Sequence, residues 1–397
     1  MDRKFLYSTL SISKTENLMM FLFLCMGGNK MLIGVTDYYA IILVVVFYYF
    51  FRKRNMVFSS DFNKWLLFFI VLFLFQFIIL KEKSIPADIN FLAKFFCAYL
   101  GVTILGEKFR YAYFKTITWI ALVSLLMSLL VLLTHGNIPG IDLERSRSLV
   151  VFNYYPNMSS LRTYRNCGMF WEPGAFQGYI MLVPLLYIGQ IKQFWATYRK
   201  ECLILLVTLL STVSTTGYVT LAAFLFLIVL KKVKNLVTRT IIIVLMFTGG
   251  IYAYNTFDFL GEKLEIQYAE AQELGRGDVT WSRFGATIID IDNIKKNPLI
   301  GNGFLMKERY GNLAEYMGGT GNGLTGAINI FGVPIIFIYL LSLFKRAPTH
   351  SDYEKVVFTI VVFLMLIGEF FLNYPPFWSL LFVKYPKLCI NRANKLF

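Results

Sequence analysis

The chain has 397 residues, of which 57% are hydrophobic and 16% are charged, and its formal net charge is +15. Soluble globular domains normally carry about 25% charged residues, so this composition excludes an ordinary soluble enzyme or binding domain. Apolar runs recur along the whole chain, and at about 20 residues for each bilayer crossing they leave room for roughly a dozen crossings.

The apolar runs predict membrane spans in chain order at residues 18–28, 35–51, 64–80, 89–106, 115–134, 173–190, 201–213, 217–230, 240–256, 323–344, 356–373 and 374–385. The first, seventh and last runs are short, so we expect about 11–12 transmembrane helices. Inside lipid the backbone must satisfy its own hydrogen bonds, and runs of this length do so as helices. The predicted fold class is therefore all-α, a polytopic integral membrane helix bundle in a single domain over residues 1–397.

The positive charge follows the predicted topology. With the N-terminus inside, the inner segments carry the whole of the positive excess, in clusters such as Arg52-Lys53-Arg54 and Lys231-Lys232, and the rest of the chain is slightly negative. Cytoplasmic loops of membrane proteins carry such an excess of Lys and Arg. We therefore expect a bacterial inner-membrane protein with both termini in the cytoplasm, and no nucleic-acid partner.

Two connections are long, residues 135–172 and 257–322, and the alternation of spans puts both on the periplasmic side. The first is rich in Asn, Tyr, Ser, Pro and Arg, which predicts irregular structure. The second predicts helices over residues 260–274 and 281–296, separated by a Gly-Arg-Gly-Asp turn. Long loops in a compact protein usually carry function, so we expect one outward-facing site built from both.

The most informative stretch lies where the first long loop enters the sixth span. Glu172 precedes Pro173, which fits the first turn of a helix. A helix N-terminus with an arginine nearby, here Arg165, is suited to hold an anion. An alternative stays open, in which Glu172 only caps its helix and Arg165 only pairs with it.

This stretch resembles a known family. The pattern Arg-x-x-Gly-x-Phe-x-Glu-Pro resembles the signature of O-antigen polymerases (the Wzy family), with Arg165, Gly168, Phe170, Glu172 and Pro173 in its positions. Two further parts of the chain are similar to the second outer loop of the broader superfamily of O-antigen polymerases and ligases. They are Trp281 to Phe284 followed by Asn297 to Phe304, and Thr320 to Leu324 followed by Gly332.

The resemblance implies a glycosyltransferase that acts at the periplasmic face. Its donor and acceptor are oligosaccharide repeats linked through pyrophosphate to undecaprenol, and the growing chain is transferred to the next lipid-linked repeat. Membrane lipids surround such an enzyme, no cofactor is implied, and a chain-length regulator is the protein partner that the family suggests.

Two other functions stay open. A ligase that transfers the glycan to lipid A core has the same architecture, but ligases of the superfamily carry a histidine in the second outer loop. The two histidines of this chain, His135 and His350, lie elsewhere. A flippase for the same lipid is expected to have shorter loops and internal repeat symmetry.

The departing pyrophosphate is anionic, and arginine matches phosphate oxygens with two parallel hydrogen bonds. We predict Arg165 and Arg283 as catalytic arginines, because each lies in a family-like segment, and Glu172 as the base for the acceptor hydroxyl. Further predicted substrate-binding residues are Arg147, Arg162, Arg276, Asp278, Asn322 and Lys94. Arg309, beside Glu308, is expected to be a solvated surface residue.

Three other ionisable features need an interpretation. Asp290-Ile291-Asp292 resembles the Asp-x-Asp metal motif, but residues two apart on a helix point to different faces, so we expect no metal. Lys94 and Glu369 lie about one turn inside the outer ends of their predicted spans. Snorkelling to the interface is the favoured interpretation for Lys94. The alternative is a functional intramembrane charge, with Lys94 meeting the lipid pyrophosphate.

Overall fold

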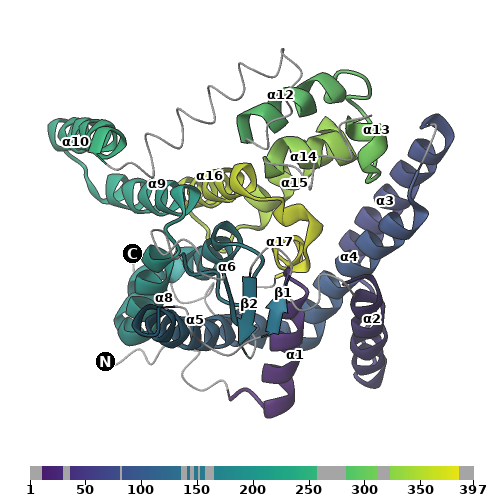
Figure 1. Cartoon of the computed structure of the whole chain (residues 1–397), viewed down its shortest axis with the longest axis horizontal. Coiled ribbons are helices and arrows are strands. Elements are labelled where there is room, and N and C mark those ends of the chain that lie inside the picture. Colours follow the sequence, from purple (N-terminus) through teal and green to yellow (C-terminus); the bar gives the residue numbers. More distant parts are fainter. Residues whose placement is uncertain are drawn as a thin grey trace.

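A computed structural model describes residues 11–29, 36–80, 83–135, 141–143, 147–150, 153–156, 165–256, 283–310 and 322–383 (Figure 1). Helices form most of it. The first part comprises α1 (Lys14–Cys25), α2 (Thr36–Lys53), α3 (Ser60–Ile79), α4 (Ile85–Leu105), α5 (Phe109–Leu133), α6 (Pro173–Leu186), α7 (Ile191–Thr197), α8 (Arg199–Ser211), α9 (Thr215–Lys232) and α10 (Leu236–Thr256). The second part comprises α12 (Arg283–Ile294), α13 (Met306–Tyr310), α14 (Gly323–Phe331), α15 (Val333–Arg346), α16 (Asp352–Gly368) and α17 (Pro375–Ser379).

Several helices are suited to cross a membrane. Helix α3 (Ser60–Ile79) is long and apolar enough by itself, and so is the run Ile85–Leu133, which comprises α4 and α5 and counts here as one helix. Two helix pairs pass the same test together but are bent, α6 with Ile188–Thr197 by 53° and α14 with α15 by 118°. The described part of the chain therefore has two such helices, or up to four if each bent pair is one span. The helical, membrane-compatible architecture is confirmed at this level, whereas the number of about a dozen crossings stays a prediction.

The surface of these helices agrees with their apolar sequence. On α3, Leu67, Leu74 and Ile78 are exposed, whereas Phe69 and Gln76 on another face are buried. Soluble monomers rarely expose contiguous apolar area of this kind, so the outward face of α3 is suited to contact lipid.

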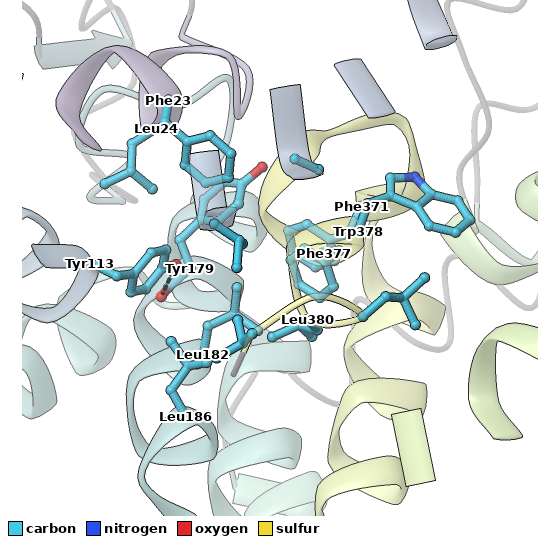
Figure 2. Packing of buried hydrophobic residues seen from close by; sticks show 14 of the residues in the cluster. Phe23, Leu24, Tyr113, Tyr179, Leu182, Leu186, Phe371, Phe377, Trp378 and Leu380 are labelled. Atoms are coloured by element: carbon cyan, nitrogen blue, oxygen red, sulfur yellow. Dashed lines mark hydrogen bonds between the residues drawn. The ribbon is translucent and has the colours of Figure 1, made fainter. Parts of the chain in front are cut away.

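The core is aromatic and centres on the short helix α17. The Trp378 ring contacts those of Phe69, Phe91 and Phe95 from α3 and α4, and its Nε1 donates a hydrogen bond of 2.7 Å to the Leu372 carbonyl oxygen. Figure 2 shows Trp378 with Phe371, Phe377 and Tyr179 in this core. The predicted last span, 374–385, is wrong as a crossing helix, because α17 ends at Ser379 and all five of its residues are buried.

The first long loop contains a small sheet where we expected irregular structure. Strands β1 (Ile141–Leu143), β2 (Arg147–Val150) and β3 (Asn153–Pro156) pair antiparallel in the order β1-β2-β3, with Ser148 opposite Asp142 on one side and Tyr155 on the other. Ile, Leu, Val and Tyr in these segments favour strands, whereas the polar residues between them led to the prediction of irregular structure.

Ion pairs join helix ends that are far apart in the sequence. They are Glu16–Lys108 at 3.0 Å, Glu16–Arg54 at 4.0 Å, Lys115–Glu201 at 2.9 Å, Lys231–Glu354 at 2.6 Å, and Asp61–Arg346. Each of these residues lies in, or directly beside, a segment that the sequence predicts to be cytoplasmic. The ion pairs therefore connect segments that are all predicted to lie on the cytoplasmic side of the membrane.

Candidate functional site

The entry to α6 has the form that the sequence predicts. Pro173 is the first residue of the helix, and Glu172 is its N-cap, with extended backbone. The Glu172 side chain makes no capping hydrogen bond, so the interpretation of Glu172 as a conventional side-chain cap is not supported.

The segment before Glu172 is anchored to two helices. Buried Asn166 donates through Nδ2 to Ser124 Oγ on α5 at 3.1 Å and to Ser211 Oγ on α8 at 3.0 Å, while its Oδ1 accepts from the Gly168 amide at 2.9 Å. Arg165 donates from Nε to the Thr212 carbonyl oxygen at 3.3 Å, so its side chain runs along the turn between α8 and α9.

Tyr374, between α16 and α17, is the centre of the candidate site. Its ring stacks on that of Trp171, with 4.7 Å between centroids, and Lys94 Nζ lies 5.5 Å from the Tyr374 centroid. The carboxylates of Glu172 and Glu369 both act electrostatically on the Tyr374 phenol. We call these five residues the Tyr374 cluster. It unites α4, the entry to α6, and the segment that follows α16.

Lys94 lies deeper than we expected from the sequence. Helix α4 begins at Ile85, because Ser84 caps it and Pro86 occupies its first turn, so Lys94 is about two and a half turns inside. Its exposed fraction is 4%. The interpretation that its ammonium snorkels to the interface is therefore wrong. A buried ammonium requires compensating charge, and the Tyr374 cluster contains two carboxylates.

Glu369 ends α16 and lies at the beginnings of two other helices. A Cβ built on Gly174, in the first turn of α6, would overlap Glu369 Oε1, and one built on Gly323, the first residue of α14, would overlap the Glu369 carbonyl oxygen. The two glycines thus leave the space that Glu369 occupies. Helices α6 and α14 are the first halves of the two bent pairs, so both bent pairs begin beside Glu369.

The second long loop is held against α14 by a buried polar network. Asp290 on α12 is fully buried. Its Oδ1 accepts hydrogen bonds from Tyr310 Oη at 2.9 Å and Asn329 Nδ2 at 2.8 Å, and its Oδ2 accepts one from Thr325 Oγ1 at 2.8 Å. Burial raises the pKa of the Asp290 carboxyl above its usual value, although these three donors and the charge of Arg309 lower it.

Asp290 and Asp292 point to different faces of α12, as their spacing predicts. Asp292 is exposed and pairs with Lys295 at 2.8 Å. Within the described ranges, no group of three or more His, Cys, Asp and Glu side chains is arranged to hold a metal ion. Arg309 lies in the network around Asp290 and is 6% exposed, so its assignment to the solvated surface is wrong. Helix α13 turns the guanidinium over the Tyr310 ring, at 5.1 Å.

The family-like segment that includes Gly301 joins the second loop to the bend at Gly332. The Asn302 amide donates to the Asn329 carbonyl oxygen at 2.6 Å, and the Val333 amide donates to that of Pro298 at 2.9 Å. From α3, buried Gln76 donates through Nε2 to the carbonyl oxygens of Ile300 at 2.6 Å and Ile330 at 2.8 Å. This segment is therefore structural, and it holds the bend against α3.

The remaining predicted site residues are in several places. Asn322 is the N-cap of α14, where its Oδ1 accepts from the amides of Leu324 at 3.0 Å and Thr325 at 3.3 Å. Arg283 begins α12 and Arg147 begins β2, and their side chains lie outside the part of the chain that is described. Arg162, Arg276 and Asp278 lie outside the described residues altogether, as does the helix predicted over 260–274.

Tyr374 and Glu369 are candidate site residues that we did not predict from the sequence. A usable signal was present, because Glu369 is the one acidic residue after Glu354, and it is followed closely by the helix-breaking pair Pro375-Pro376. An isolated acid in an apolar run next to a break in the helix is a reasonable indication of a site.

A comparison with known protein families finds no family model that matches this chain, and no curated protein matches it either. The candidate function therefore depends on the residues themselves. The Tyr374 cluster combines two carboxylates, an ammonium and two stacked aromatic rings among apolar helices. Such a set is suited to accept a proton and to hold an anionic group where water is scarce.

Proposed function

We propose that the protein is a polymerase of lipid-linked oligosaccharide repeats, of the O-antigen type. It transfers the growing undecaprenyl-pyrophosphate-linked glycan to the next lipid-linked repeat at the periplasmic face of a bacterial inner membrane. The observation that carries the proposal is that Lys94 lies over the Tyr374 ring while Trp171, the residue before Glu172, stacks on the same ring. The sequence predicts Lys94 and Glu172 as site residues for separate reasons, Lys94 as an intramembrane charge and Glu172 within a family-like motif.

The position of the cluster supports a lipid-linked substrate. A lipid tail fixes the attached pyrophosphate near the headgroup level, so the reacting bond lies close to the ends of membrane helices. Glu172 is at the beginning of α6 and Glu369 at the end of α16. The ion pairs that gather the predicted cytoplasmic segments support the prediction that this cluster belongs to the opposite, outer end.

The proposed reaction assigns a role to each predicted residue. The acceptor hydroxyl attacks the anomeric carbon of the donor glycan, and the new glycosidic C–O bond forms as the bond to the pyrophosphate oxygen breaks. Glu172 takes the hydroxyl proton. The undecaprenyl pyrophosphate leaves with the electron pair, and the cations of Lys94, Arg165 and Arg283 stabilise its charge.

The lipopolysaccharide banding pattern of a deletion strain tests this function against its alternatives. Loss of a polymerase leaves a single repeat on the core, loss of a ligase leaves bare core, and loss of a flippase leaves no repeat outside the inner membrane. The missing histidine in the second loop favours the polymerase over the ligase. Purified protein should also lengthen lipid-linked repeats in vitro without a lipid A core acceptor.

A further inference from the structure

The Tyr374 cluster contains two carboxylates in unlike surroundings. We propose that the two carboxylates have different catalytic roles, and that the role of Glu369 is electrostatic. Glu369 stays ionised and stabilises the positive charge that develops at the anomeric carbon, while Glu172 takes the proton. This inference rests on the proposed polymerase function and assigns a second carboxylate to the same site.

The surroundings of Glu369 combine burial, which by itself disfavours a charged carboxylate, with a helix N-terminus, which favours one. Its exposed fraction is 6%, whereas Glu172 is half-buried. The Glu369 carboxylate packs against Gly174 in the first turn of α6, where unpaired backbone N–H groups concentrate partial positive charge. These N–H groups favour the charged form of a carboxylate placed beside them, so in the proposed division Glu369 keeps its charge and Glu172 takes the proton.

The space for Glu369 is built into two helices, α6 for its carboxylate and α14 for its main-chain carbonyl. Gly174 and Gly323 stand where any side chain would displace Glu369. The neighbouring residue Gly368 is equally close to Thr216 on α9, so the chain on that side of Glu369 is also fixed. The contact with Gly174 places the carboxylate itself, and the contacts of Gly323 and Gly368 fix the backbone that carries it, which is the rigid support that an electrostatic role requires.

The groups that face Glu369 agree with this division. Lys94 from α4 lies over the Tyr374 ring. Tyr179 on α6 and Tyr374 are both within electrostatic range of Glu369. Glu172 acts on Tyr374 from the entry to α6. Neither phenol is an anion at neutral pH. The cluster thus has one cation and two anions, and an anionic pyrophosphate is drawn to Lys94 while the sugar ring lies towards the carboxylates.

In the proposed step Glu369 neither gains nor loses a proton. As the bond from the anomeric carbon to the pyrophosphate oxygen breaks, electron density leaves with the pyrophosphate, and the sugar ring becomes partly positive. The Glu369 carboxylate offsets this charge. The acceptor oxygen then completes the new bond, and its proton passes to Glu172.

Glu369→Gln keeps the shape of the side chain and removes its charge. We expect kcat for repeat extension by purified protein to fall on the order of 10²- to 10³-fold. The acidic limb of the pH–rate profile, attributed to Glu172, should remain in Glu369→Gln and disappear in the residual activity of Glu172→Gln. Glu369→Asp should restore part of the rate, and Gly174→Ala, which displaces the carboxylate, should lower the rate as Glu369→Gln does.

The controls separate a failure of this inference from a failure of the proposed function. If the parent protein lengthens repeats and Glu369→Gln, with unchanged thermal stability in detergent, retains the parental kcat, Glu369 has no catalytic role. If Glu369→Gln removes the acidic limb, Glu369 is the base and the division is reversed. If the parent protein itself does not lengthen repeats, the polymerase function is wrong.

Discussion

Gly301 in the second loop lies directly against Gly332, at the bend between α14 and α15. A Cβ on Gly301 would overlap the Ile330 carbonyl oxygen, and one on Gly332 would overlap that of Leu299. Both glycines have left-handed backbone conformations, with φ of 71° and 84°. The loop and the bend therefore fit together through backbone alone, with no room for a side chain on either.

Gly301→Ala should destabilise the protein by about 2 kcal/mol or more, because it adds both left-handed strain and a clash with backbone. The measurement is thermal unfolding in detergent. Gly249→Ala is the matched control, since Gly249 lies in α10 with nothing within 4 Å of its added Cβ. That variant should be neutral or more stable by up to about 1 kcal/mol. Equal effects of the two substitutions would contradict the close fit at Gly332.

The stability of the second loop should depend on pH through Asp290. Its folded-state pKa is raised by burial, so its ionisation opposes folding. The associated stability is fully present below the unfolded value near 3.8 and is lost as pH rises through the raised folded value. The parent protein should therefore lose stability relative to Asp290→Asn over this window. The measurement is the melting temperature of both proteins across the pH range. A parent protein that gains stability relative to Asp290→Asn as pH rises would refute the raised pKa.

Replacement of Arg165 tests the arginine predicted to meet the pyrophosphate. Arg165→Ala should lower kcat by about 10²-fold, which corresponds to roughly 3 kcal/mol of transition-state stabilisation. Arg165→Lys should recover only part of the rate, because an ammonium cannot form two parallel hydrogen bonds to phosphate. Full recovery by Lys would mean that only the charge matters. A full ladder of chain lengths in cells that express Arg165→Ala normally would remove Arg165 from the site.

The predicted sidedness can be tested by labelling single cysteines in intact spheroplasts with a reagent that does not cross the membrane. In a background without native cysteines, Ser148→Cys in β2 and Gly311→Cys in the second loop should be labelled at once. Asp352→Cys, at the start of α16, should be labelled only after the membrane is opened. The reverse pattern would show that the orientation is inverted.

Local signals in the sequence predicted several elements well. Pro173 begins α6 as its position after Glu172 indicates, and the run over 281–296 contains α12. The opposite directions of Asp290 and Asp292 follow from helical spacing alone. These features depend on residues within a few turns of one another, which is the range that a pattern in one sequence can report.

Features that depend on contacts between distant segments were not predictable in this way. Nothing near Lys94 indicates that Tyr374 will lie over it, and nothing near Arg309 indicates that Asp290 will face it. The bend of 118° at Gly332 interrupts a run that is apolar enough for one straight span. The chain turns at Gly332, whose φ is 84°, and Pro334 lies in the first turn of α15, but the loop segment that packs against the bend lies about thirty residues earlier in the chain.

The two hydrogen bonds of Gln76 bear on how the protein is made. Gln76 is fully buried in α3, and its acceptors lie 224 and 254 residues later, at Ile300 and Ile330. During synthesis α3, which is long and apolar enough to span a membrane, leaves the ribosome long before either acceptor does. A polar amide in lipid must then remain close to water or to another protein until most of the chain has been translated. The second loop can dock on α3 only after that point, and only then can Gly323 of α14 pack against Glu369 of the Tyr374 cluster.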